Sequence, residues 1–221
     1  MTSATTTASD LAALMCSRLC HDMLSPVGAM SNGLELLASE SDPEMRQNYI
    51  DLLEQSAKIS ANKLKFFRLA FGAAGGFGDR VDIDEPRELI EQLASDKGRI
   101  AINWALDAPN LSKPAVKVML NYSQIAIDAL VRGGTLDIGA EVQNGASELV
   151  LRASGPKIAF DDVLSLALSG DLDPEELTSR TAPAYMLHLI ADSCGGQLQT
   201  ARTEDALLLG AVLPEPEGMI G

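Results

Sequence analysis

The glycine-rich segment at residues 72–79, GAAGGFGD, divides the 221-residue chain into two parts with different patterns. Before it, apolar residues recur from residue 9 at the three- and four-residue spacing of amphipathic helices. After it, short strand-like and helix-like segments alternate as far as residue 214. Glycine clusters interrupt helices and strands alike, so this one predicts a linker. We therefore expect an α+β protein with a helical domain at 9–71, a linker at 72–79, an α/β domain at 80–214, and flexible tails at 1–8 and 215–221.

The helical domain reads as two long helices joined by a turn, SESDPE, at residues 39–44. Ser9 or Asp10 is suited to cap the first helix. Pro43 falls at the first position of the second helix, where its missing N–H costs nothing. Two helices enclose too small a core to be stable alone, whereas two copies of the hairpin would complete a four-helix bundle. The sequence thus predicts a homodimer.

The α/β domain is predicted from segments that alternate in type. Strands pairing mainly with near neighbours, with helices between them, favour an α/β sandwich that has its helices on one face of the sheet. The expected strands lie at 80–83, 99–106, 135–143, 148–154, 197–202 and 206–213, and the expected helices at 86–95, 113–132 and 182–194.

Charge and composition exclude several classes of partner. The formal net charge of −14 would repel nucleic acid and anionic lipid, so neither is expected to bind. No apolar run reaches the roughly 18 residues that a membrane span requires, and the first residues, MTSATTTASD, lack the pattern of a secretory signal. Three cysteines cannot all pair with one another. These features predict a reduced, cytoplasmic protein.

His21, one of only two histidines, lies within the first predicted helix. With successive side chains about 100° apart, it points away from the apolar stripe of that helix. The stripe consists of Leu11, Met15, Leu19, Met23, Pro26, Met30, Leu34 and Leu37. Ser25, Gly28, Asn32 and Glu35 share the outward face with His21. An outward position disfavours a histidine packed in the core.

Two other roles for His21 are disfavoured by its neighbours in the sequence. Cys16 and Cys20 could supply metal ligands, but they lie on the flank of the helix and no second ligand cluster is present, so no metal is expected. A hydrolase triad would need a nucleophile motif such as G-x-S-x-G, which the chain lacks. Pro26 is either a tolerated kink or a bend that presents His21 to a partner.

His21 and Asp22, followed by Pro26 five positions after the histidine, resemble the phosphoacceptor motif of two-component sensor histidine kinases. In that family a helical hairpin dimerises into a four-helix bundle, the outward histidine accepts phosphate, and the following domain binds ATP. The resemblance therefore implies that 80–214 forms a histidine-kinase-ATPase-like α/β sandwich.

The nucleotide-binding motifs of such kinases are altered in this chain. Asp128 stands where a kinase has the asparagine that meets Mg-ATP, which adds charge repulsion with phosphates. Ala153 and Lys157 replace the aspartate and the second glycine of the adenine-binding motif. Thr181 and Pro183 replace both glycines of the phosphate loop. A kinase-like chain without nucleotide chemistry is similar to the histidine phosphotransferases of ChpT type, found in cell-cycle phosphorelays.

That resemblance implies a phosphate shuttle. His21 would take phosphate from a phospho-aspartate in the receiver domain of a hybrid histidine kinase and pass it to the aspartate of a response regulator. The receiver domain would bring its own Mg²⁺, and this chain would bind no cofactor. Asp22 would orient the imidazole or accept its proton.

The outer face near His21, at Leu24, Ser25, Gly28 and Asn32, is the expected docking surface for receiver domains. Two alternatives remain at this point. One is an ATP-dependent kinase. The other is a non-catalytic binding protein that inhibits a kinase or sequesters a response regulator.

Overall fold

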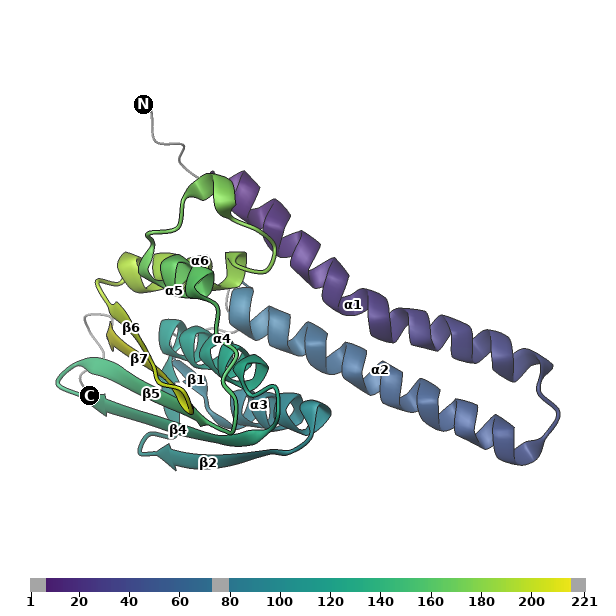
Figure 1. Cartoon of the computed structure of the whole chain (residues 1–221). Helices are drawn as coiled ribbons and strands as arrows, with labels where there is room; N and C mark the ends of the chain where they lie inside the picture. The colour runs from purple at the N-terminus through teal and green to yellow at the C-terminus, as the bar shows by residue number, and fades with distance from the viewer. Residues whose placement is uncertain (1–6, 73–79, 216–221) are drawn as a thin grey trace.

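A computed structural model describes residues 7–72 and 80–215. Residues 1–6, 73–79 and 216–221, which contain most of the predicted linker and tails, lie outside the described residues. A long helical hairpin projects from an α/β domain (Figure 1). Helices α1 (Ala8–Ser39) and α2 (Pro43–Phe71) form the hairpin, as the apolar spacing predicts.

The first helix begins at a different cap from the one expected. Thr7 is the N-cap: its hydroxyl accepts a hydrogen bond from the Asp10 backbone at 3.1 Å, and the Asp10 carboxylate accepts one from the Thr7 backbone at 3.2 Å. This reciprocal box satisfies two free N–H groups, whereas a cap at Ser9 or Asp10 would not form it. Helix α2 begins as predicted, with Asp42 as its cap and Pro43 in its first turn.

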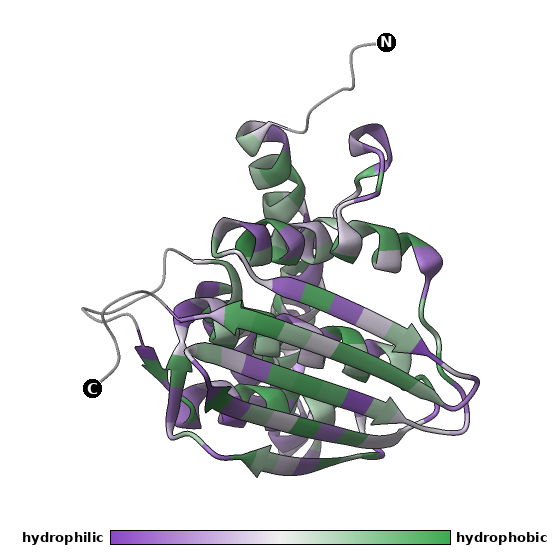
Figure 2. Cartoon of the chain, turned by 90° about the vertical axis from the view of Figure 1, so that its left-hand side faces the viewer, coloured by the Kyte–Doolittle hydropathy of each residue, from purple (hydrophilic) through white to green (hydrophobic). Residues whose placement is uncertain are grey.

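The sheet of the C-terminal domain has five strands in the order β2-β4-β5-β7-β6. The strands are β2 (Ile100–Leu106), β4 (Gly134–Gln143), β5 (Ala146–Ser154), β6 (Gln197–Arg202) and β7 (Ala206–Pro214). Only the β2–β4 pair is parallel among these neighbours. Helices α3 (Asp84–Lys97), α4 (Lys113–Ala129) and α6 (Ala182–Ser193) cover one face of the sheet, and the other face is open toward the viewer in Figure 2. The predicted two-layer sandwich is confirmed.

The core lies between this sheet and helix α4. Alternate residues of β4, such as Leu136 and Ile138, are buried against the helices, and their neighbours on β5 and β7 continue the same apolar layer. Tyr122 of α4 is fully buried, and its hydroxyl donates to the Gly210 carbonyl at 3.0 Å. Burial raises the pKa of Tyr122, because the phenolate would be desolvated there.

Three short elements were not predicted. Strand β3 (Asn110–Ser112) pairs with β1 (Arg80–Asp82), helix α5 (Asp162–Ser169) packs on α6, and a 3₁₀ turn spans Pro174–Glu176. Each is too short to show a periodic pattern. Glu215, assigned to the flexible tail, instead belongs to the domain, because it forms an ion pair with Arg80 at 2.8 Å and accepts a hydrogen bond from Ser147.

The apolar stripe of α1 faces α2 except at one position. Pro26 is buried and most other members of the stripe are half-buried, but the Leu34 side chain is 59% exposed. No part of the described chain covers that flank of the hairpin. In the described ranges, no helix is both long and apolar enough to cross a membrane.

The hairpin is attached to the C-terminal domain through the last turns of α2. Phe66 and Ala70 are buried there, and the rings of Phe66, Phe67 and Phe71 lie with centroids 5.2 to 6.4 Å apart. Beside this contact a cleft of about 520 Å³ separates the hairpin from α3, α4 and the start of α6. We call it the interdomain cleft.

Candidate functional site

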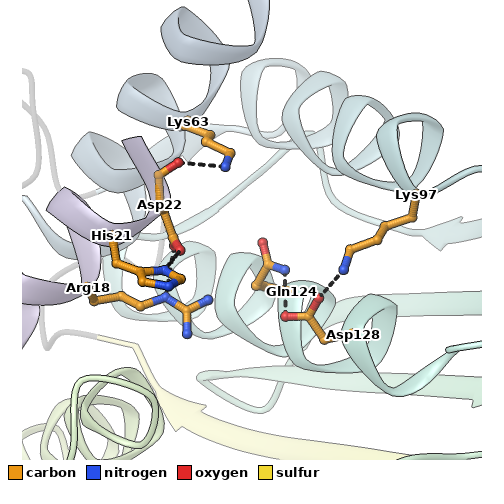
Figure 3. A network of polar contacts seen from close by, with 7 residues as sticks. All are labelled: Arg18, His21, Asp22, Lys63, Lys97, Gln124 and Asp128. Atoms are coloured by element: carbon orange, nitrogen blue, oxygen red, sulfur yellow. Dashed lines mark hydrogen bonds and ion pairs between the residues drawn. The ribbon is translucent and has the colours of Figure 1, made fainter. Parts of the chain in front are cut away.

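His21 lies on α1 with 80% of its side chain exposed, on the side away from the helix pairing (Figure 3). Its Nδ1 is 3.3 Å from Oδ1 of Asp22. A carboxylate can only accept a hydrogen bond, so Nδ1 is the donor in this contact, and in a neutral ring the lone pair then belongs to Nε2. The geometry therefore presents Nε2 to solvent as a nucleophile.

Asp22 is shared between two partners on its own helix. Arg18 donates from Nε to Oδ2 at 2.8 Å, while the other carboxylate oxygen meets His21. The Arg18 and Asp22 side chains are only 26% and 21% exposed. Such a partly buried ion pair fixes the carboxylate more firmly than a surface pair would.

Lys63 reaches the same turn of α1 from the opposite helix. Its ammonium donates to the backbone carbonyl of Asp22 at 2.7 Å (Figure 3). Asp22 is thus held at its side chain by Arg18 and at its backbone by Lys63. Sequence reasoning missed both cations. The four-residue spacing of Arg18 and Asp22 could have indicated the first, but nothing in the sequence brings Lys63, 41 residues away, to this carbonyl.

The predicted docking residues lie on the exposed side of α1 near His21. Leu24 is 71% exposed, and Ser25 and Asn32 are also exposed. At Gly28 an added Cβ would meet nothing within 4 Å. This side of α1 is therefore accessible. It presents the apolar side chain of Leu24, and because Gly28 has no side chain, another protein can approach the helix backbone closely there.

The altered nucleotide motifs fall into two groups in space. Asp128 of α4 and Pro183 of α6 line the interdomain cleft, across from Arg18 and Asp22. Asp128 forms an ion pair with Lys97 at 2.9 Å and accepts a hydrogen bond from Gln124 at 2.9 Å (Figure 3).

The remaining altered positions do not line the interdomain cleft. Ala153 is fully buried in β5, Lys157 is exposed after that strand, and Thr181 is buried at the N-terminus of α6.

Other candidate ligands are not assembled around His21. Cys16 and Cys20 are exposed free thiols. Across residues 7–72 and 80–215, no group of three or more His, Cys, Asp or Glu side chains is placed to hold a metal ion. The second histidine, His188, packs against Tyr185 and against Gly170, where a Cβ would collide with the imidazole. His188 therefore has a packing role.

An α+β chain that presents an accessible histidine, buttressed by a carboxylate, on a helical hairpin defines a protein suited to phosphoryl transfer through that histidine. The model of the histidine phosphotransferase C-terminal domain matches residues 83–206. Protein phosphotransferase ChpT of Brucella abortus (strain 2308) is 30% identical over 207 residues, covering 94% of this chain and 97% of that protein. The chain therefore belongs to the histidine phosphotransferase family.

A solved structure of a bacterial phosphotransferase has the same fold. It superposes with a TM-score of 0.80 at 29% identity, covering 95% of this chain and 98% of the other. The similarity includes the hairpin as well as the C-terminal domain, so it extends over the region that carries His21.

Proposed function

We propose that this chain is the shuttle of a two-component phosphorelay. His21 takes a phosphoryl group from a phospho-aspartate in the receiver domain of a hybrid histidine kinase and passes it to the aspartate of a response regulator. The observation that carries the proposal is the exposed His21 with its Nδ1 held by Asp22, in a chain of this family. Cell-cycle control in the cytoplasm is the setting that the resemblance implies, and the free thiols fit a reducing compartment.

The chemistry requires an in-line attack by a neutral imidazole. Nε2 of His21 attacks the phosphorus, a P–N bond forms, and the P–O bond to the donor aspartate breaks to release a carboxylate. A carboxylate oxygen of the response regulator then attacks the same phosphorus, and the P–N bond breaks to return the imidazole. Asp22 stabilises the positive charge that develops on the ring.

The Mg²⁺ that neutralises the phosphoryl oxygens comes with the receiver domain, and this chain supplies no cofactor. The strip formed by Leu24, Ser25, Gly28 and Asn32 is the proposed contact with receiver domains. Its residues lie within about three turns of His21 on the exposed side of α1.

A homodimer is supported by apolar side chains that the single chain leaves exposed at seven-residue spacing. On α1 these are Ala13, Cys20, Val27 and Leu34, and on α2 they are Ile50, Ala57 and Leu64. None of them lines the interdomain cleft. Apolar residues that recur every seven positions form the contact line between helices packed side by side in bundles. A second hairpin would therefore bury the exposed apolar rows of both α1 and α2.

The interdomain cleft argues against transfer of phosphate from ATP. The Asp128 carboxylate, paired with Lys97, stands where a nucleotide would bring further negative charge. Pro183 offers no N–H to a phosphate in the first turn of α6. The phosphoryl donor is therefore a phosphorylated protein.

The decisive experiment uses receiver domains that carry labelled phosphate. The wild-type chain and its His21→Ala variant are each mixed with phosphorylated receiver, and a third sample receives labelled ATP alone. The proposal predicts label on the wild type with receiver, none on the variant, and none with ATP. Label from ATP would instead indicate a kinase, and tight receiver binding without label would indicate a non-catalytic binding protein.

A further inference from the structure

Pro26 removes one hydrogen bond from α1, and the acceptor that it leaves free belongs to Asp22. In an α-helix the N–H of each residue donates to the carbonyl four residues earlier. Proline has no N–H, so the carbonyl four residues before Pro26 has no helical donor. Pro26 is buried on the side of α1 that faces α2, and a buried carbonyl without a partner is costly.

Lys63 supplies the missing donor from α2. Its Nζ lies 2.7 Å from the Asp22 carbonyl oxygen, as Figure 3 shows. The lysine is partly buried and lines the interdomain cleft with Arg18 and Asp22. A hydrogen bond donated by an ammonium is stronger than the backbone N–H···O=C hydrogen bond that it replaces. It also joins two helices, whereas the backbone hydrogen bond would join two turns of one helix.

We infer that Lys63 is a positioning residue for phosphoryl transfer: it replaces the backbone hydrogen bond that Pro26 deletes and thereby fixes the turn of α1 that carries His21 and Asp22. The inference rests on the proposed function of His21. It also gives the proline of the phosphoacceptor motif a physical purpose, because the freed carbonyl is the point where α2 anchors α1.

The carbonyl that Lys63 contacts belongs to the residue that also holds His21. Asp22 is the residue whose side chain meets Nδ1 of His21, so movement of its backbone changes the direction of the carboxylate. Arg18 holds the carboxylate from within α1, and Lys63 holds the backbone from outside it. Without Lys63, the proline leaves this turn with one free carbonyl and greater freedom to unwind.

Three variants separate positioning from simple helix packing. Lys63→Met keeps the aliphatic stem and removes the donors, Lys63→Arg keeps a charged donor, and Lys65→Met removes a nearby exposed lysine as a matched control. The readout is single-turnover transfer from a phosphorylated receiver domain, measured over a range of receiver concentrations.

Lys63→Met should lower the maximal transfer rate about tenfold, because a small misplacement of the nucleophile is expensive. The half-saturating receiver concentration should stay within about twofold, because receiver binding is not the step affected. Lys63→Arg should recover most of the rate, and Lys65→Met should match the wild type. A wild-type rate in Lys63→Met, or a change in half-saturation alone, would overturn the inference. A wild-type chain that takes no label would overturn the proposed function itself, and the role of Lys63 with it.

The partnership with Pro26 is tested by a double-mutant cycle. Pro26→Ala restores the N–H, so the Asp22 carbonyl regains its helical donor and Lys63 becomes redundant. In that background Lys63→Met should slow transfer by less than about threefold and leave the midpoint of thermal unfolding unchanged. In the parent chain the same substitution should lower both the transfer rate and this midpoint. Equal losses in the two backgrounds would show that Lys63 does not act through this carbonyl.

Discussion

Replacing Asp22 by asparagine removes a charge next to His21 and keeps a hydrogen-bond acceptor of almost the same shape. A hydrogen bond to a charged group contributes about 1.5 to 3 kcal/mol, and a neutral partner is roughly half as strong. The Nδ1–Oδ1 distance of 3.3 Å is long for a charge-assisted bond, which favours the lower end of that range in the resting protein. Half of about 1.5 kcal/mol corresponds to a rate that is about 3.5-fold slower.

The contact should strengthen as the reaction proceeds, because attack by Nε2 places positive charge on the imidazole. Docking of a receiver domain over His21, whose side chain is 80% exposed in the free chain, removes solvent from this contact and weakens the screening of the charge. The upper end of the range then applies, and half of about 3 kcal/mol is about a tenfold loss. We therefore expect Asp22→Asn to slow transfer by about 3- to 10-fold, and Asp22→Ala, which removes charge and orientation together, to slow it by at least about tenfold.

Rapid-quench measurement of label transfer at saturating receiver gives these rates directly. Glu35→Gln makes the same change of carboxylate to amide at an exposed position on the same face of α1, and it should leave the rate unchanged. Transfer at the wild-type rate in both Asp22 variants would refute the assignment of Asp22 as the group that buttresses the nucleophile. A loss as large in Asp22→Asn as in Asp22→Ala would show that the charge, and not the orientation, carries the whole effect.

Three further substitutions test the surfaces of the hairpin. Gly28→Ala should raise the free energy of unfolding by about 0.5 to 1 kcal/mol in denaturant titrations, because alanine favours the helix and its Cβ meets open space. Gly28→Trp should keep that stability but raise the half-saturating receiver concentration about tenfold, and unchanged saturation would remove Gly28 from the docking surface. Leu34→Glu, at a side chain 59% exposed in the single chain, should convert the dimer to monomer in size-exclusion chromatography with light scattering. Asn48→Glu, at an exposed position on the side of α2 away from Ile50, is its control, and a Leu34→Glu chain that stays dimeric would exclude this flank as the interface.

Periodicity was enough to predict that His21 points outward from α1. Spacing along α1 placed the histidine opposite the buried Pro26, and the turn before Pro43 fixed where the second helix begins. The strands of the sheet were likewise visible as apolar segments, because alternating burial leaves a clear mark over six or more residues. Local rules therefore account for most of the fold and for the outward face of the site.

The parts that the sequence did not reveal depend on distant or reciprocal contacts. Thr7 caps α1 because it exchanges two hydrogen bonds with Asp10. Capping preferences of single residues do not include such reciprocal pairs, so they could not distinguish Thr7 from Ser9 or Asp10. The bond from Lys63 to the Asp22 carbonyl joins residues far apart in sequence, and only the packing of two helices creates it.

In the proposed relay His21 is the residue that carries the phosphoryl group. Mass-spectrometric mapping tests this role: the phosphate is located on the 221-residue chain after brief mixing with a phosphorylated receiver, and again after a chase with a second, unphosphorylated receiver domain. We expect phosphate on His21 that disappears during the chase and reappears on the second receiver. Phosphate on any other residue, or phosphate on His21 that the second receiver cannot remove, would contradict this role.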